Sequence, residues 1–189
     1  MAATTTSAAR APAAAAARSP DWIDELGSAW RREYRGVDTG ALPPLVRLAR
    51  LAVLLEAFEG QVLRPFELAR SDYGVLAMLR RAGPPYELSP SQLTSELDRS
   101  SGGMTKILKR LEDAGLVRRL PDPDDGRGSR VSLSKSGLEL QDRVFHAFLD
   151  ASRAVLSRLS AVKLRDADRA LRVLLGAFEA HLAGDDDGA

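Results

Sequence analysis

Cationic side chains gather in one short stretch of this chain, where they could bind phosphate groups. Residues 99–119 hold six Lys or Arg residues and two acidic ones, a local charge of +4, whereas the 189-residue chain as a whole carries only +1. A near-neutral protein that binds a polyanion must concentrate its positive charge on one face in this way. The six cationic residues are Arg99, Lys106, Lys109, Arg110, Arg118 and Arg119.

Small polar residues and two glycines open this stretch, in the run Ser101-Gly102-Gly103-Met104-Thr105-Lys106. Each glycine costs a helix about 1 kcal/mol relative to alanine. Without a side chain, however, the backbone can approach a grooved surface closely, and the free N–H groups of a helix N-terminus favour phosphate. We therefore expect Gly102 and Gly103 to contact nucleic acid, with Ser101, Thr105 and Lys106 able to read base edges. The alternative is that the glycines only form a loose turn.

The remaining candidate contacts are cations that would bind phosphate or a minor groove. Lys109 and Arg110 would contact phosphates, which makes binding steeply salt-dependent. Arg127 stands between two glycines in a linker rich in turn-forming residues. One arginine on a slim hairpin tip can enter a narrow minor groove, and Asp125 could hold it or shape the turn. The alternative is a tip that only contacts solvent.

Composition excludes several classes of chemistry. The chain has no Cys, which rules out disulfides, Cys-ligated zinc, iron–sulfur clusters and a cysteine redox sensor. Two isolated histidines, His146 and His181, do not suggest a metal site. Neither a G-x-S-x-G motif nor a phosphate loop is present, so we predict no catalytic residue, no metal, no cofactor and no enzyme activity.

The sequence does not predict a membrane span or an export signal. No apolar run approaches the ~18 residues that a membrane span needs. The Ala-rich start lacks the Leu/Val/Ile-rich centre of a signal peptide, and Pro12 interrupts it. We expect a soluble cytoplasmic protein that has no membrane partner.

The apolar residues mostly recur with helical spacing, which predicts a mainly helical chain. Ser89-Pro90-Ser91-Gln92 is the clearest helix start, because it combines an N-cap serine, proline in the first turn and glutamine three residues after the cap. Ser71 and Ser101 are predicted to cap the helices on either side. We expect helices over about 21–34, 43–62, 71–82, 90–97, 101–113, 134–159 and 163–182, and strands over 116–120 and 130–133.

Two short helices joined by a few residues, followed by a hairpin, give the order of a winged helix-turn-helix. The predicted fold class is therefore mainly α with a small β-wing, flanked on both sides by long apolar-faced helices. The expected parts are an Ala/Pro-rich tail over 1–20, N-terminal helices over 21–66, the winged lobe over 67–134, C-terminal helices over 135–183 and an acidic tail over 184–189. The tail over 1–20 is too poor in large apolar side chains to fold.

Three runs in the lobe resemble the MarR family of bacterial transcriptional regulators. They are Leu111-Glu112-Asp113-Ala114-Gly115-Leu116-Val117-Arg118-Arg119, the linker over 121–128, and Val131-Ser132-Leu133-Ser134-Lys135-Ser136-Gly137. The family pattern is LE-x-x-GLV-x-R, a wing Asp-x-Arg and V-x-L-T-x-x-G. Here Ser134 replaces the threonine and Gly126 replaces a common wing arginine. The element order matches over 45–183, and the motifs are dense over 73–137.

The resemblance implies a homodimer built from N- and C-terminal dimerisation helices, which binds a near-palindromic operator in double-stranded DNA as a repressor. A small ligand usually releases the DNA in this family. The likeness is greatest to the branch that has an added N-terminal helix and responds to urate and other organic anions. Its ligand site uses a Trp and a wing Arg, which correspond to Trp30 and Arg119, and an Asp and an Arg, which Gly74 and Ile107 replace.

We therefore expect an aromatic or carboxylate effector near Trp30 and Arg119, and not urate. The leading hypothesis is a dimeric, sequence-specific DNA-binding regulator. The alternative is a winged-helix module that binds another protein and never touches nucleic acid, because a charged run is more often a solvated face than a binding site. Salt-dependent binding to duplex DNA would distinguish the two.

Overall fold

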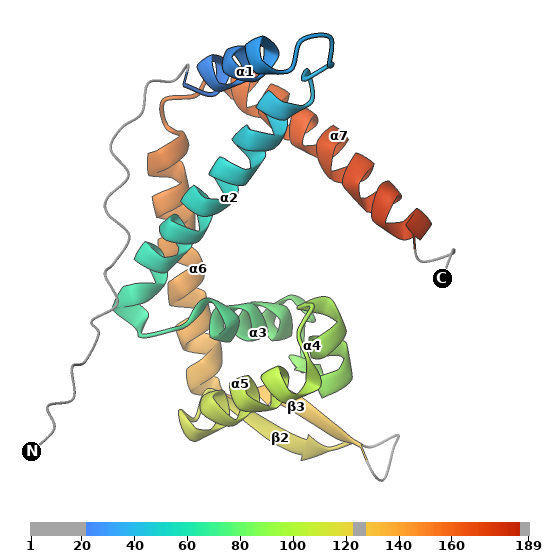
Figure 1. Ribbon diagram of the computed structural model, residues 1–189. Coiled ribbons are helices and arrows are strands. Elements are labelled where there is room, and N and C mark those ends of the chain that lie inside the picture. Colours follow the sequence, from blue (N-terminus) through green and yellow to red (C-terminus); the bar gives the residue numbers. More distant parts are fainter. Residues whose placement is uncertain (1–21, 123–127, 186–189) are drawn as a thin grey trace, which may run out of the picture. The chain divides into compact units, whose positions relative to one another are not determined.

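The computed structural model describes residues 22–122 and 128–185 of the chain. The chain divides into two compact units, Met1–Ala57 and Phe58–Ala189. The boundary between these units falls within the second helix, and the predicted division of the chain after residue 66 stays a prediction. The elements (Figure 1) are α1 Trp22–Glu33, α2 Leu42–Leu63, a short 3-10 helix Arg64–Phe66, α3 Arg70–Arg81, β1 Glu87–Leu88, α4 Pro90–Glu96, α5 Ser101–Asp113, β2 Val117–Pro121, β3 Ser129–Leu133, α6 Lys135–Leu156 and α7 Ala161–Asp185.

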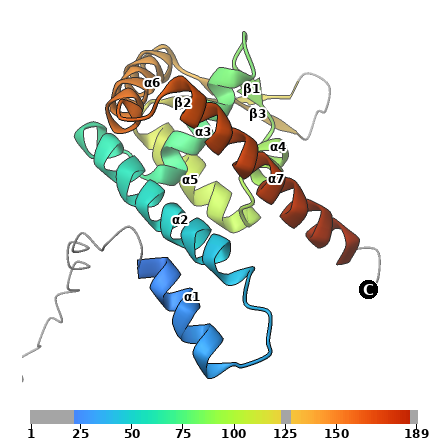
Figure 2. The same ribbon diagram turned by 90° about the horizontal axis from the view of Figure 1, so that it is seen from above.

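The first unit is built from α1 and most of α2. Figure 2 shows α1 alongside the N-terminal half of α2. The helices approach closely at Gly27, where an added Cβ would lie 3.3 Å from Cγ of Pro43. Arg47 Nη2 donates to Asp24 Oδ1 at 2.6 Å across the same pair of helices. Both groups are well exposed, so this ion pair contributes little to stability.

The second unit contains the main hydrophobic core. Apolar faces of α3, α4 and α5 meet the sheet there, and Figure 1 shows α5 beside the β2–β3 hairpin. The helical spacing of the apolar residues explains why one stripe of each helix is buried. The buried residues are Val75, Leu76, Met78, Leu79, Leu93, Met104, Ile107, Leu108, Leu111, Val117, Val131 and Leu133.

A three-stranded antiparallel sheet forms the wing, with the strand order β1-β3-β2. In β2 and β3, Arg118 pairs with Ser132 and Leu120 with Arg130. The first strand, β1, has only two residues, Glu87 and Leu88, which pair with Ser132 and Val131. This strand could not be predicted from the sequence, because two residues are too few to show an alternating pattern.

The junction of α5, β2 and α6 explains the family-like motif in this region. Gly115 follows α5 with φ 69°, a left-handed conformation that glycine adopts without a steric penalty. The hydroxyls of Ser134 and Ser136 both donate to the Gly115 carbonyl, at 2.6 and 2.8 Å. A Cβ on Gly137 would lie 2.0 Å from the Leu116 carbonyl oxygen, so only glycine fits in this turn of α6.

The predicted elements are confirmed, and two predicted caps are wrong. The N-cap of α3 is Ala69, not Ser71, and the carboxylate of Asp72 accepts from the Ala69 N–H at 3.2 Å. The N-cap of α5 is Ser100, not Ser101. The acceptor at the start of α3 is Asp72, which stands next to Ser71, and the acceptor at the start of α5 is Ser100, which stands next to Ser101. Sequence spacing alone does not show which of two adjacent polar residues accepts the hydrogen bond at a helix start. No helix in the described part of the chain is long and apolar enough to span a bilayer.

Candidate nucleic-acid interface

Two capped helices, α4 and α5, set the geometry of the candidate interface. Ser89 Oγ accepts from the Gln92 N–H at 3.2 Å, and Gln92 Oε1 accepts from the Ser89 N–H at 2.8 Å, which completes the predicted capping box. Ser100 Oγ accepts from the Gly103 N–H at 3.2 Å at the start of α5. These caps fix where each helix begins, and therefore which residues of α5 stand at its exposed N-terminal end.

The predicted contact residues lie on the face of α5 that the core leaves open. Ser101, Gly102, Thr105, Lys106 and Lys109 are exposed. Gly103 is half-buried, and an added Cβ would lie 3.1 Å from the capping Ser100 hydroxyl. The opposite face is held in the core by Met104, Ile107, Leu108 and Leu111. A helix anchored by one apolar face, with a small and cationic outer face, can enter a groove of duplex DNA.

The two lysines on this face differ in their surroundings. Lys109 Nζ pairs with Asp113 on the next turn, at 3.1 Å, and both groups are mostly exposed. Such a pair is worth little in water and can exchange for a phosphate contact. Lys106 pairs with no carboxylate in the part of the chain that the structure describes. Thr105 Oγ1 donates to the Ser101 carbonyl at 2.9 Å, which orients its side chain along the helix.

Arg110 is held by a buried carboxylate on another helix. Its Nε lies 3.0 and 3.1 Å from the two carboxylate oxygens of Asp72 in α3, and its Nη2 donates to the same group. Nη2 also lies 3.4 Å from Ser71 Oγ. The hydrogen bond to Asp72 raises the pKa of Arg110, and the charge of Asp72 adds to the effect. The guanidinium is thus already engaged, although we predicted it as a phosphate contact.

The wing and its flanks are only partly described. Asp125 and Arg127 fall in 123–127, outside the described residues, so their predicted roles stay predictions. On β2, Arg119 Nε lies 3.6 Å from Glu112 Oε2 of α5. Arg119 also lines a hollow of about 440 Å³ with Ser101 and Thr105, among other residues of α4 and α5.

Trp30 lies in the first unit, where it lines a different hollow of about 430 Å³. Its ring lies 5.4 Å from that of Tyr34, and the hollow also includes Thr39, whose buried hydroxyl has no hydrogen-bond partner in the described part of the chain. The ligand site that we predicted from Trp30 and Arg119 therefore stays a prediction. Gly74 and Ile107 line one further hollow of the second unit, together with Glu59, Arg70 and Arg99.

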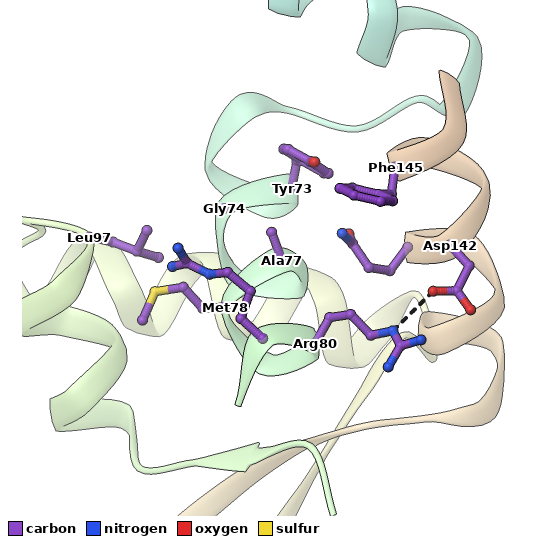
Figure 3. Close-up of a pocket in the computed structure, with 10 residues that line it drawn as sticks. Tyr73, Gly74, Ala77, Met78, Arg80, Leu97, Asp142 and Phe145 are labelled. Carbon is purple, nitrogen blue, oxygen red and sulfur yellow. Dashed lines mark hydrogen bonds and ion pairs between the residues drawn. The ribbon is translucent and has the colours of Figure 1, made fainter. Parts of the chain in front are cut away.

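A larger cavity, of about 590 Å³, lies within the second unit between α3 and α6 (Figure 3). Tyr73 and Phe145 line it, and Arg80 donates to Asp142 at its edge, at 3.0 Å. Burial raises the pKa of Tyr73, whereas a hydrogen bond with Gln141 opposes the change. This cavity could not be predicted from the sequence, because α3 and α6 come together only in the folded chain. The described residues include no cluster of His, Asp and Glu suited to a metal ion.

Comparisons with known proteins agree with this fold. The model of the MarR family matches residues 66–128. The HTH-type transcriptional regulator PecS of Dickeya dadantii is 32% identical over 160 residues, which cover 85% of this chain and 94% of PecS. A mutant MarR from E. coli in complex with operator DNA matches with a TM-score of 0.60 and 26% identity, over 70% of this chain and 94% of that one. AbsC from Streptomyces coelicolor, at 24% identity, shares the fold with a TM-score of 0.66, over 78% of this chain and 99% of AbsC.

The winged-helix fold, together with the likeness to PecS and to MarR, defines a DNA-binding transcriptional regulator. The chain belongs to the MarR family, as its likeness to PecS over most of both chains shows. The branch of the family that this sequence most resembles responds to urate, but the comparisons do not extend that response to this chain. The residues at two of the four expected positions, Gly74 and Ile107, cannot supply the carboxylate and the guanidinium.

Proposed function

We propose that the chain is a homodimeric repressor that binds a pseudo-palindromic operator and is released by a small organic ligand in the cytoplasm. The main observation in support of DNA binding is the exposed face of α5. Ser101, Gly102, Thr105 and Lys106 stand clear of the core there, at the N-terminal end of a helix whose other face is buried. In this position Thr105 and Lys106 would meet base edges, and Lys109 would meet a phosphate.

Exposed apolar side chains on the long helices support the dimer. A helix that leaves many large apolar residues in water is expected to bury them against another chain. On α2 these residues are Leu42, Leu45, Leu51, Val53, Leu54 and Leu55, and on α7 they are Val162, Leu164, Leu171, Val173, Leu175, Phe178 and Leu182. A two-fold dimer would present α5 twice on one side of the duplex, with half-sites about one helical turn apart.

A footprint on the DNA upstream of the chain's own reading frame tests operator binding. The wild-type protein should protect an inverted repeat, and its affinity should fall steeply with salt. Arg127→Ala should weaken binding by about tenfold, because a narrow minor groove attracts arginine strongly. Arg153→Ala, which removes an exposed arginine of α6 paired only with Asp150 among the described residues, is the matched control and should bind normally. Salt-independent binding by the wild type would contradict the proposal.

The ligand hypothesis rests on the aromatic face of Trp30 and the cation of Arg119. A Trp22→Phe variant leaves Trp30 as the one tryptophan, so its fluorescence reports directly on that site. Titration with phenolic and carboxylate metabolites should quench the signal and release the operator. Arg119→Gln should weaken both effects, whereas Arg118→Gln on the same strand should not. If no compound gives quenching or release, the repressor is not controlled through this site.

A further inference from the structure

The pair Asp72–Arg110 joins the N-terminal turn of α3 to the outer helix α5. The side chain of Asp72 is only 6% exposed, while that of Arg110 is 52% exposed. The carboxylate also accepts from the Ala69 N–H at 3.2 Å, so its position on α3 is fixed from both sides. Arg110 approaches with Nε and Nη2 together, the fork geometry in which arginine binds a carboxylate with most directional control.

The apolar contacts of α5 are not directional, whereas a forked hydrogen bond is, so the ion pair adds directional control to the position of the helix. Met104, Ile107, Leu108 and Leu111 hold one face of the helix in the core. Apolar packing of this kind tolerates small rotations and slides, because aliphatic contacts are not directional. A forked hydrogen bond to a fixed carboxylate does not tolerate them.

We propose that Arg110 is a positioning residue, and that its pairing with Asp72 sets the orientation of α5 for operator binding. This inference rests on the proposed function. It replaces the expectation that Arg110 contacts a phosphate, because a guanidinium that leaves Asp72 for DNA would abandon a buried carboxylate without its counter-charge. The phosphate contacts of α5 then come from the lysines, which face solvent.

The salt dependence of operator affinity separates the two roles of Arg110. A lost phosphate contact lowers the slope of log affinity against log salt by about one, whereas a lost positioning contact leaves that slope unchanged. The probe is the duplex that the wild-type full chain selects from a random-sequence library. Binding to an unrelated duplex of the same length, measured beside it, reports non-specific affinity.

Asp72→Asn and Arg110→Lys are the informative variants. We expect each to weaken binding to the selected duplex by about tenfold or more, with the wild-type salt slope and unchanged binding to the unrelated duplex, because a site held too loosely loses fit but not charge. A misfolded protein would lose both kinds of binding. The double variant should be no worse than the single ones, since both remove the same contact.

Asp113→Asn is the matched control, because it removes a carboxylate of α5 that pairs with Lys109 at the surface. It should leave specific affinity unchanged or slightly higher. The inference is overturned if Asp72→Asn binds as tightly as the wild type or tighter, or if Arg110→Lys binds normally and Arg110→Ala lowers the salt slope by about one. Failure of the wild type to select any sequence would instead overturn the proposed function, and this inference with it.

Discussion

Among single residues, Gly102 best tests whether a glycine in α5 is needed for the fold or for DNA binding. It lies in the first turn of α5, and a Cβ added there would meet no atom within 4 Å. Nothing in the fold therefore requires glycine at this position. We expect Gly102→Ala to stabilise the protein by up to about 1 kcal/mol, because alanine favours the helix.

The same substitution should weaken operator binding by about tenfold, since a methyl group would keep the backbone away from the duplex. Denaturant unfolding and fluorescence anisotropy on one preparation measure the two effects. Normal operator binding by the stabilised variant would mean that the glycine only forms a turn, which was the alternative from the sequence.

We expect the charge of Lys106 to contribute directly to operator affinity. It faces solvent and has no ion-pair partner among the residues described, so its ammonium group is available to DNA. We expect Lys106→Ala to lower operator affinity and to reduce the salt slope by about one, as the loss of one phosphate contact requires.

The matched control for Lys106 is Lys135→Ala, which removes a lysine of α6 whose side chain is 92% exposed. This variant should keep the wild-type affinity and slope. Equal losses from the two lysines would show that only the overall charge of the protein attracts DNA.

At the scale of elements, Gly137 fixes the start of α6 against the end of α5. A Cβ there would overlap the Leu116 carbonyl oxygen, which is a backbone atom and cannot move aside as the end of a flexible side chain could. We expect Gly137→Ala to destabilise the fold by about 3 kcal/mol or more, in the range of overpacked core sites. Thermal and denaturant unfolding measure the loss.

Gly176→Ala in α7 is the comparison for that substitution, because a Cβ at Gly176 meets nothing within 4 Å in this chain. It should be neutral or stabilising. If Gly137→Ala unfolds at the wild-type midpoint, then the close approach of α6 to Leu116 is not what keeps glycine in this motif.

The elements were predictable from the sequence to the extent that their signals are local. The capping box at Ser89 and Gln92 placed α4 correctly, since all its atoms lie within four residues. The contact between Asp72 and Arg110 was not predictable, because 38 residues separate the partners and only the fold brings them together. For the same reason, the expectation for Arg110 rested on its charge alone and missed the carboxylate that engages it.

At the scale of the whole molecule, the exposed apolar face of α7 should decide the oligomeric state. Leu171 and Leu175 lie one turn apart, and both are exposed in the single chain. We expect Leu171→Asp with Leu175→Asp to give a monomer, because two buried charges without partners oppose association. Analytical ultracentrifugation measures the change, and operator affinity should fall with it.

Arg169→Ala is the control for that double variant. It removes one exposed arginine of α7, whose ion pair with Asp166 is worth little. The control should remain a dimer. A double variant that also stays a dimer would place the association surface elsewhere on the chain.

Operator binding by a homodimer is best tested by the stoichiometry and pattern of protection when the wild-type protein binds its own upstream DNA. Two copies of the chain should bind together to one inverted repeat, with protected half-sites about one helical turn apart on the same side of the duplex. Binding by a single copy, protection with no repeat, or no preference over unrelated DNA would contradict it.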